Sequence, residues 1–196
     1  LTDSEGNRYI DLFGGIAVNI LGYGYPSYTR KLIAQIETGI LHTSNLYYVE
    51  PQTRLARMLT ERTFADRVFF ANSGAEANEG AVKLARKYFF NKGSKRYKVL
   101  SLHDSFHGRT LAMVAATAQA KYQKLYSPLR AAFVNFEPGD IEALRQATDE
   151  ETCAVMLELI QGEGGVLPFP AEYVNQVRAL CDELGILMIV DEVQTG

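Results

Sequence analysis

The chain has 196 residues, of which 47% are hydrophobic and 22% are charged, and its formal net charge is -3. This composition is typical of a globular protein and excludes a disordered one, while the slight negative charge argues against nucleic acid or an anionic membrane as an obligate partner. No apolar run approaches the roughly 20 residues that span a bilayer, and the polar start is neither a signal nor a transit peptide, so we expect a cytoplasmic protein.

Residues 1–66 differ in pattern from the rest of the chain. A turn that contains glycine and a stretch rich in glycine and tyrosine come first, and two helices are predicted near 27–40 and 51–63. We interpret this part as an N-terminal segment that packs on the domain that follows or on another subunit.

From Arg67 onward, short β-rich apolar runs alternate with amphipathic helical stretches, which is typical of a parallel α/β sheet. Strands are predicted at 67–72, 98–103, 131–136, 153–160 and 187–193. In the helix after the first strand, the spacing places on one face Ala77, Ala81, Leu84, Ala85 and Tyr88. The helix before the last strand, which can end at Gly185 as its C-cap, also has one apolar face, made up of Val174, Val177, Leu180, Cys181 and Leu184.

The two cysteines, Cys153 and Cys181, lie inside apolar periodic segments. Such positions favour buried thiols over a disulfide or a catalytic nucleophile.

Ligands of an open parallel sheet bind beyond the carboxyl ends of its strands, so the residues after each strand are the most informative. The first strand is followed by NSGAEANE, in which Ser73 and Glu76 can form a capping box and Gly74 allows the backbone to approach a ligand. The free N–H groups of this helix start suit an anion, best a phosphate. A well-capped helix without a ligand is the alternative.

The second and fourth predicted strands lead into further polar segments. In HDSFHGRT, Phe106 offers a face for stacking a flat ring and Arg109 a bidentate partner for a carboxylate. Taken alone, a phenylalanine there is more often a core residue and an arginine more often part of a surface ion pair. In ELIQGEGGV, Glu158 lies in the strand and Glu163 in a glycine-rich loop, which places an acidic group near the mouth of the sheet. A lone loop glutamate is usually just solvated.

Asp191 ends the last predicted strand, directly after LMIV. Burial there would raise its pKa unless a cation meets it, and a protonated pyridine nitrogen would be such a partner. A helix cap or a metal ligand is the alternative, but no His or Cys cluster with ligand spacing accompanies it. Together the segments supply sites for a phosphate, a ring face, a ring nitrogen and a substrate carboxylate, which are the parts of a pyridoxal phosphate (PLP) site.

NSGAEANE, SFHGRT, IQGEGGV and DEVQTG, in this order, resemble the motifs of the class III aminotransferases of PLP fold type I, and the resemblance covers essentially all residues. It implies a mostly parallel sheet flanked by helices. Residues 1–66 would form part of the small domain and interface helices, and residues 67–196 the first part of the large PLP-binding domain. In the family, the lysine that holds PLP lies beyond DEVQTG, so we expect an incomplete chain that is inactive alone.

The resemblance also implies roles for individual residues. Gly74 and Ala75 would hold the phosphate through their backbone N–H groups, and Phe106 would stack on the pyridine ring.

The remaining implied roles belong to the end of the chain and to the substrate site. Asp191 would pair with the ring nitrogen as the catalytic carboxylate, Val193 would pack beneath the ring, and Gln194 would reach the phenolic oxygen. Arg109 would receive the α-carboxylate of the donor. Glu163 matches a position that shields a downstream arginine in related ornithine and 4-aminobutyrate transaminases.

The upstream segments GGIAVNILGYGYP and HTSNLYYVEPQ are similar to the branch of the family that uses N-acetylornithine. The implied reaction moves its terminal amino group to 2-oxoglutarate, in arginine biosynthesis, within a homodimer. Tyr23 and Tyr25 stand where the family often has histidines, and Leu159 where proline is common, which leaves open ornithine, succinylornithine, succinyl-diaminopimelate or 4-aminobutyrate as donor.

Two rival interpretations belong to other classes of protein. A dinucleotide-binding oxidoreductase would need G-x-G-x-x-G after the first strand, where NSGAEANE stands instead. The second rival interpretation is an interaction or assembly module without catalytic activity.

Overall fold

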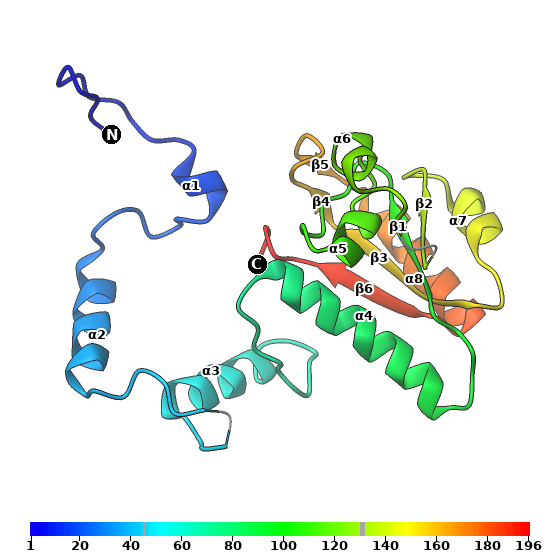
Figure 1. Cartoon of the computed structure of the whole chain (residues 1–196), viewed down its shortest axis with the longest axis horizontal. Helices are drawn as coiled ribbons and strands as arrows, with labels where there is room; N and C mark the ends of the chain where they lie inside the picture. Colours follow the sequence, from blue (N-terminus) through cyan, green and yellow to red (C-terminus); the bar gives the residue numbers. More distant parts are fainter. Residues whose placement is uncertain (45, 130–131) are drawn as a thin grey trace. The chain divides into compact units, whose positions relative to one another are not determined.

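The computed structural model describes residues 1–44, 46–129 and 132–196. The chain divides into two compact units, Leu1–Phe69 and Phe70–Gly196 (Figure 1). Within the described residues, no helix combines the length and the apolar character that crossing a membrane requires.

The described residues of the first unit contain three helices, α1 (Gly14–Ala17), α2 (Pro26–Glu37) and α3 (Glu50–Thr60). A proline in the first turn of α2 and of α3 suits a helix start, because the missing N–H would have no partner there. The two longer helices were both predicted, and both end earlier than the prediction. After α2, Gly39 adopts a φ of 71°, a left-handed conformation that ends helices. No residue of the three helices is buried.

The second unit is built on a four-stranded parallel sheet in the order β2-β1-β3-β6. Its strands are β1 (Lys98–Leu102), β2 (Phe133–Phe136), β3 (Thr152–Glu158) and β6 (Leu187–Asp191). They confirm the strands predicted at 98–103, 131–136, 153–160 and 187–193, except that Ala131 lies outside the described residues. In the register, Glu158 pairs with Asp191, so two carboxylates end neighbouring strands.

Two parts of the strand prediction are wrong. Residues 67–72 form no strand, because their backbone groups find no ladder partner among the described residues and an apolar run alone does not make a strand. The predicted strand 153–160 ends at Glu158. The chain then turns into a short antiparallel hairpin of β4 (Ile160–Gln161) and β5 (Leu167–Pro168).

Helices cover both faces of the sheet (Figure 1). On one face, α4 (Gly74–Asn91) and α5 (Leu111–Ala116) pack in a core cluster that contains Val99 and Met156. On the other, α7 (Ile141–Ala147) and α8 (Ala171–Leu184) pack in a cluster that contains Leu100 and Val155. Neighbouring strand residues thus point to opposite faces, as the pleat requires. The predicted α/β class is confirmed. Two short helices, α6 (Ala120–Gln123) and η1 (Lys124–Tyr126), follow α5.

The buried face of α4 differs from the predicted one. Leu84 and Tyr88 are 71% and 41% exposed, and the buried residues are Asn78, Val82, Ala85 and Phe89. The prediction followed only apolar residues. The buried face also includes the polar residue Asn78, because its side chain donates hydrogen bonds to the His107 carbonyl and to Asp191.

The α8 face agrees with the prediction at its centre, where Val177, Leu180 and Cys181 are buried. The helix ends at Gly185, whose φ of 62° is left-handed, as expected for its cap. Cys153 and Cys181 are buried free thiols, as predicted, and burial raises the pKa of each to about 11.

Candidate functional site

Asp191 ends β6 as a buried carboxylate with three hydrogen-bond donors. Oδ2 accepts from Asn78 Nδ2 and lies 2.7 Å from His107 Nδ1, while Oδ1 accepts from the Val193 N–H. Burial by itself would raise the pKa of Asp191, but the hydrogen bond and the charge of His107, with Val193 and Asn78, outweigh it and lower the pKa. The sequence predicted that burial would raise the pKa of Asp191 unless a cation met it. The chain itself supplies a partner, His107, whose imidazole carries positive charge when protonated and favours the ionised form of Asp191.

His107 is a site residue that the sequence reasoning missed. Its side chain is fully buried, its backbone N–H donates to Thr117 Oγ1 at 2.8 Å, and its ring Nε2 has no partner among the described residues. The available signal was its place between Phe106 and Arg109, both of which had been singled out.

Glu158 adds a second buried carboxylate beside this pair. Its Oε1 accepts the Phe106 N–H, and its Oε2 has no partner among the described residues. Burial raises its pKa. One ligand atom each of His107, Glu158 and Asp191 lies within 4.8 Å of the others, a set that could hold a metal ion. Spacing could not reveal it, because the three residues come from three segments. The short contact between His107 and Asp191 has the geometry of a hydrogen bond, which favours a hydrogen-bonded cluster.

The start of α4 is the helix end at which an anion site is predicted. Ser73 Oγ accepts the N–H of Glu76 at 3.2 Å, but the Glu76 carboxylate accepts the Asn72 N–H rather than that of Ser73, so only half of the capping box forms. The N–H groups of Gly74 and Ala75 have no acceptor within the described part of the chain. These groups can therefore receive an anion.

Close packing joins the helix start to two other motifs. A Cβ on Gly74 would lie 2.7 Å from Val193 Cγ1, and a Cβ on Gly108 would lie 2.7 Å from the Cβ of Ala75. Only glycine at both positions allows Val193 and Ala75 to pack this closely against the backbone. Gly108 also has a φ of 128°, a conformation that other residues rarely adopt. The segment after β1 and the segment after β6 thus both contact the first turn of α4.

Phe106 and Arg109 lie together with a second aromatic ring that was not predicted. The rings of Phe106 and Tyr122 meet edge to face with centroids 5.8 Å apart. The Arg109 guanidinium carbon lies 5.9 Å from the first centroid and 6.0 Å from the second. In the described residues, Arg109 makes no ion pair or hydrogen bond. An unpaired guanidinium flanked by two rings can bind a carboxylate.

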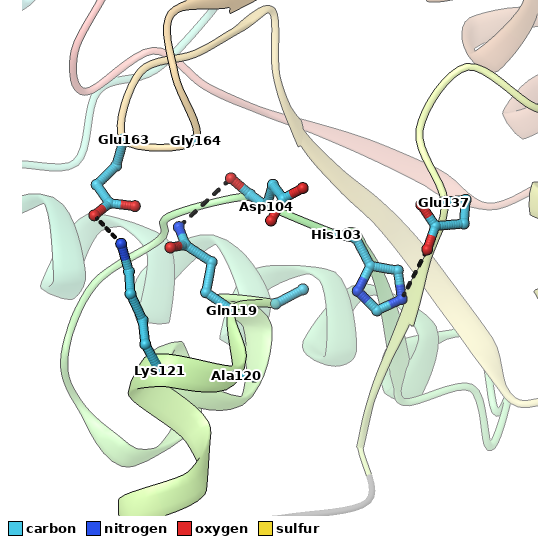
Figure 2. Close-up of a pocket in the computed structure, with 9 residues that line it drawn as sticks. His103, Asp104, Gln119, Ala120, Lys121, Glu137, Glu163 and Gly164 are labelled. Atoms are coloured by element: carbon cyan, nitrogen blue, oxygen red, sulfur yellow. Dashed lines mark hydrogen bonds and ion pairs between the residues drawn. The ribbon is translucent and has the colours of Figure 1, made fainter.

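The Glu163 carboxylate is held by hydrogen bonds and is not simply solvated, unlike most glutamates in loops. Its Oε1 accepts from Lys121 Nζ at 2.8 Å and from the Tyr122 hydroxyl at 2.9 Å. Figure 2 shows it on the rim of a cavity of about 550 Å³, with Lys121 rising from α6 to meet it. His103 and Asp104, which follow β1, line the same cavity. Lys121 and Tyr122 are further residues that the sequence reasoning missed.

Gln194 and Val193 are the last two of the site residues predicted from the sequence. Gln194 lies against the glycine-rich loop, since a Cβ on Gly162 would lie 3.3 Å from its Cγ. Val193 contacts Gly74 and is still 60% exposed, so one apolar side chain remains open at the helix start. The structure therefore links the eight predicted site residues through direct contacts and their immediate neighbours: Gly74, Ala75, Phe106, Arg109, Glu163, Asp191, Val193 and Gln194.

The chain is similar to known proteins along its whole length. The family model described as aminotransferase class-III matches residues 1–196. The acetylornithine aminotransferase of Caldanaerobacter subterraneus subsp. tengcongensis is 55% identical over 99% of this chain and 49% of its own length. The succinylornithine transaminase of Photorhabdus laumondii is 48% identical over 99% and 48%.

The chain is also similar to solved structures. The ornithine aminotransferase of Toxoplasma gondii, crystallised with partial occupancy of PLP at its active site, matches with a TM-score of 0.91 and 30% identity over 100% of this chain and 47% of that one. The chain spans about half the length of the curated relatives it matches. The family expected from the motifs is confirmed: the chain belongs to the class III aminotransferases.

Proposed function

We propose that the protein carrying this chain is a PLP-dependent aminotransferase that moves the terminal amino group of N-acetylornithine to 2-oxoglutarate. The observation that carries the proposal is the buried Asp191 carboxylate, whose pKa is lowered and whose side chain lies one contact away from the open helix start. A buried anion next to an anion-binding helix end suits a ligand with a cationic ring and a phosphate. A simple phosphate site would not need the carboxylate.

The residues present fit PLP by their chemistry. Asp191 Oδ1 accepts one hydrogen bond, from the Val193 N–H, and a carboxylate oxygen can accept another, so it can meet a protonated ring nitrogen. The unpartnered N–H groups of Gly74 and Ala75 suit the phosphate. When bound, PLP supplies an electron sink for the carbon that loses its proton.

The other residues of the site would bind and orient. Val193 offers an exposed apolar surface at the helix start, and Phe106 offers a ring on the segment after β1. Gln194 would reach the phenolic oxygen. Arg109 would receive the substrate carboxylate, because its guanidinium makes no ion pair within the described residues.

His107 and Asn78 would act on Asp191 rather than on the substrate. Their hydrogen bonds to Oδ2 fix the direction of the carboxylate and keep it charged in a buried place. A charged Asp191 would in turn keep the ring nitrogen of bound PLP protonated, which its action as an electron sink requires. Both are therefore positioning residues.

The choice of N-acetylornithine is supported by the 55% identity to a relative of that name, whereas the 48% identical relative is named for succinylornithine. The test is to purify the protein translated from the complete reading frame, record its PLP spectrum, and measure kcat/KM with 2-oxoglutarate and a panel of donors. We expect N-acetylornithine to give the highest value. A clear preference for unacylated ornithine or 4-aminobutyrate would replace the donor. No turnover with any donor would reject the function.

We further propose that the protein works as a homodimer. In the first unit, Tyr47 and Tyr48 are 71% and 98% exposed, and exposed aromatics of this kind favour interfaces. Light scattering at working concentration should give twice the subunit mass. A fully active monomer would contradict the proposal.

A further inference from the structure

We propose that Glu158 is a positioning residue that fixes which ring nitrogen of His107 carries hydrogen toward Asp191. Glu158 and His107 share one proton between Oε2 and Nε2, directly or through one bridging water, so that Nδ1 always donates to the Asp191 carboxylate. The consequence for the ring nitrogen of PLP rests on the proposed function, whereas the arrangement of the protons does not.

The hydrogen bond between His107 and Asp191 depends on a proton whose position His107 alone does not determine. Nδ1 lies 2.7 Å from Asp191 Oδ2, and the roles of the two atoms depend on the tautomer of the ring. A neutral imidazole carries its single N–H on either nitrogen, and the bond made by the second nitrogen decides which. If Nε2 held that hydrogen, a bare Nδ1 would face a carboxylate oxygen. The site therefore needs a group that meets Nε2.

Glu158 is the group that the fold brings to this place. The register of β3 and β6 pairs Glu158 with Asp191, and one ligand atom each of His107, Glu158 and Asp191 lies within 4.8 Å of the others. His107 Nε2 and Glu158 Oε2 are both buried, and both lack a hydrogen-bond partner among the described residues. Each unpaired atom would cost free energy, and a proton shared between the two satisfies both. A bridging water serves equally well over a distance of this size.

Both positions of the shared proton have the same effect on Asp191. With the proton on Oε2, Glu158 is a neutral acid that donates to Nε2, and the hydrogen of the neutral imidazole lies on Nδ1. With the proton on Nε2, His107 is an imidazolium that carries hydrogen on both nitrogens. Burial raises the pKa of Glu158, which favours a carboxyl group that shares a proton over a bare carboxylate.

The other oxygen of Glu158 contacts the segment that carries the imidazole. Oε1 accepts the Phe106 N–H at 3.2 Å. The backbone N–H of His107, in the next position, donates to Thr117 Oγ1. Two successive N–H groups are thus held, which limits how the imidazole can turn relative to Glu158 and Asp191.

Two substitutions of Glu158 separate a hydrogen donor from a charge. Glu158→Gln keeps an oxygen for the Phe106 N–H and presents an amide N–H group to Nε2, as the protonated carboxyl group does. Glu158→Met has a similar size but offers no hydrogen to Nε2. The matched control is Glu137→Met. It removes a carboxylate directly after β2, where the side chain is 78% exposed and its Oε1 lies 3.9 Å from His103 Nε2.

The first measurement compares two cofactors on the protein translated from the complete reading frame: PLP and its analogue in which a C–H group replaces the ring nitrogen. Only PLP has the nitrogen that Asp191 meets, so the ratio of the two dissociation constants reports this contact. We expect Glu158→Met to lower the preference for PLP by about three- to tenfold, the size of a coupling within one hydrogen-bond network. Glu158→Gln and Glu137→Met should keep the wild-type preference. A lost contact to Phe106 weakens both cofactors alike and cancels in the ratio.

The variant His107→Gln tests whether Glu158 acts through His107. When His107→Gln is already present, the added change Glu158→Met should not lower the preference for PLP any further. Three results would overturn the inference: a further loss in the double variant, an unchanged preference in Glu158→Met, or an equal loss in Glu158→Gln.

The second measurement does not depend on the folding of Glu158→Met. Nitrogen-15 NMR of the histidine side chains distinguishes a ring nitrogen that carries hydrogen from one that does not, and His107→Gln identifies the signals of His107. In the wild type without PLP, Nδ1 should carry hydrogen, and the Nε2 signal should shift in Glu158→Gln because its partner changes. A bare Nδ1, or an Nε2 signal that does not respond, would overturn the inference. Failure of the proposed function is distinct, because no donor would then turn over while both NMR results stand.

Discussion

The imidazole of His107 lies 2.7 Å from the carboxylate of Asp191, Nδ1 to Oδ2, and both side chains are buried. The two residues are 84 positions apart in the chain. This contact sets the charge of the site before any ligand arrives, because burial alone would favour a neutral Asp191.

The change His107→Gln tests that contact. A glutamine can still donate a hydrogen bond but cannot carry charge, so burial should then dominate and raise the pKa of Asp191. We expect a loss of about 1 to 3 kcal/mol in the free energy of unfolding at pH 7, the cost of a buried carboxylate with a poorer partner. Urea unfolding of both proteins gives the difference. Equal stability at pH 7 would mean that His107 does not hold Asp191 charged.

The pH dependence of that loss follows from the sign of the shift. Asp191 has a lowered pKa in the folded chain, so its contribution is present above its ordinary value of 3.8 and is lost as the pH falls through the folded pKa. The difference between wild type and His107→Gln should therefore hold near neutral pH, begin to shrink as the pH falls through the raised pKa of the variant, and vanish below the lowered pKa of the wild type. A difference that grows on acidification would contradict the assignment.

Glu158 is expected to behave in the opposite way. Burial raises its pKa above the ordinary 4.5, so the folded chain is less stable above that pH than it would be with a neutral group. Glu158→Gln keeps an oxygen for the Phe106 N–H and removes the charge. It should stabilise the fold at pH 7 by on the order of 1 kcal/mol and leave stability unchanged well below pH 4.5, where the wild-type group is neutral in both states. Lower stability of the variant at pH 7 would mean that the charged form is needed.

The packing of Gly74 against Val193 gives a prediction about backbone approach. A methyl group at Gly74 would lie 2.7 Å from Val193 Cγ1, which forces the valine aside. Gly74→Ala should therefore weaken PLP binding by about tenfold, the effect of roughly 1.4 kcal/mol of strain. The added change Val193→Ala should relieve the clash and restore part of the affinity, as spectrophotometric titration with PLP would measure.

Gly164→Ala provides the contrast. Its Cβ would lie 2.5 Å from the backbone oxygen of Asp104, an atom that a side-chain change cannot remove. We expect lower stability that Val193→Ala does not restore. Rescue of both glycine variants, or of neither, would refute the specific packing of Gly74 on Val193.

The sequence predicted which residues end the strands, and hence most of the site, because strand ends in a parallel sheet meet at one edge. It could not predict the partners of Asp191. Asn78 reaches it across 113 positions, and as a polar residue it was not part of the face that the apolar pattern predicted. The pairing depends on how α4 is rotated, which a hydrophobic count does not determine when polar residues are buried.

The same limit explains the missed pair Lys121 and Tyr122. They lie in a four-residue helix without a buried residue, where local periodicity carries no signal. Their partner Glu163 is about 40 positions away, 42 from Lys121 and 41 from Tyr122. The wrong strand at 67–72 has a related cause, since strand propensity is local and a strand also needs a neighbour.

The final prediction separates binding of the cofactor from binding of the substrate. Asp191→Asn keeps the size of the side chain but loses the charge that would hold a ring nitrogen protonated, so kcat should fall by roughly 100-fold or more. Arg109→Met removes the guanidinium between Phe106 and Tyr122 and leaves Asp191 and the helix start untouched. It should raise KM for the donor by about 10- to 100-fold, the equivalent of a charge-assisted hydrogen bond of roughly 1.5 to 3 kcal/mol, with the PLP spectrum unchanged. Steady-state kinetics and the absorption spectrum of each variant distinguish the two roles. If Arg109→Met lost PLP while Asp191→Asn kept full turnover, the two assignments would have to be exchanged.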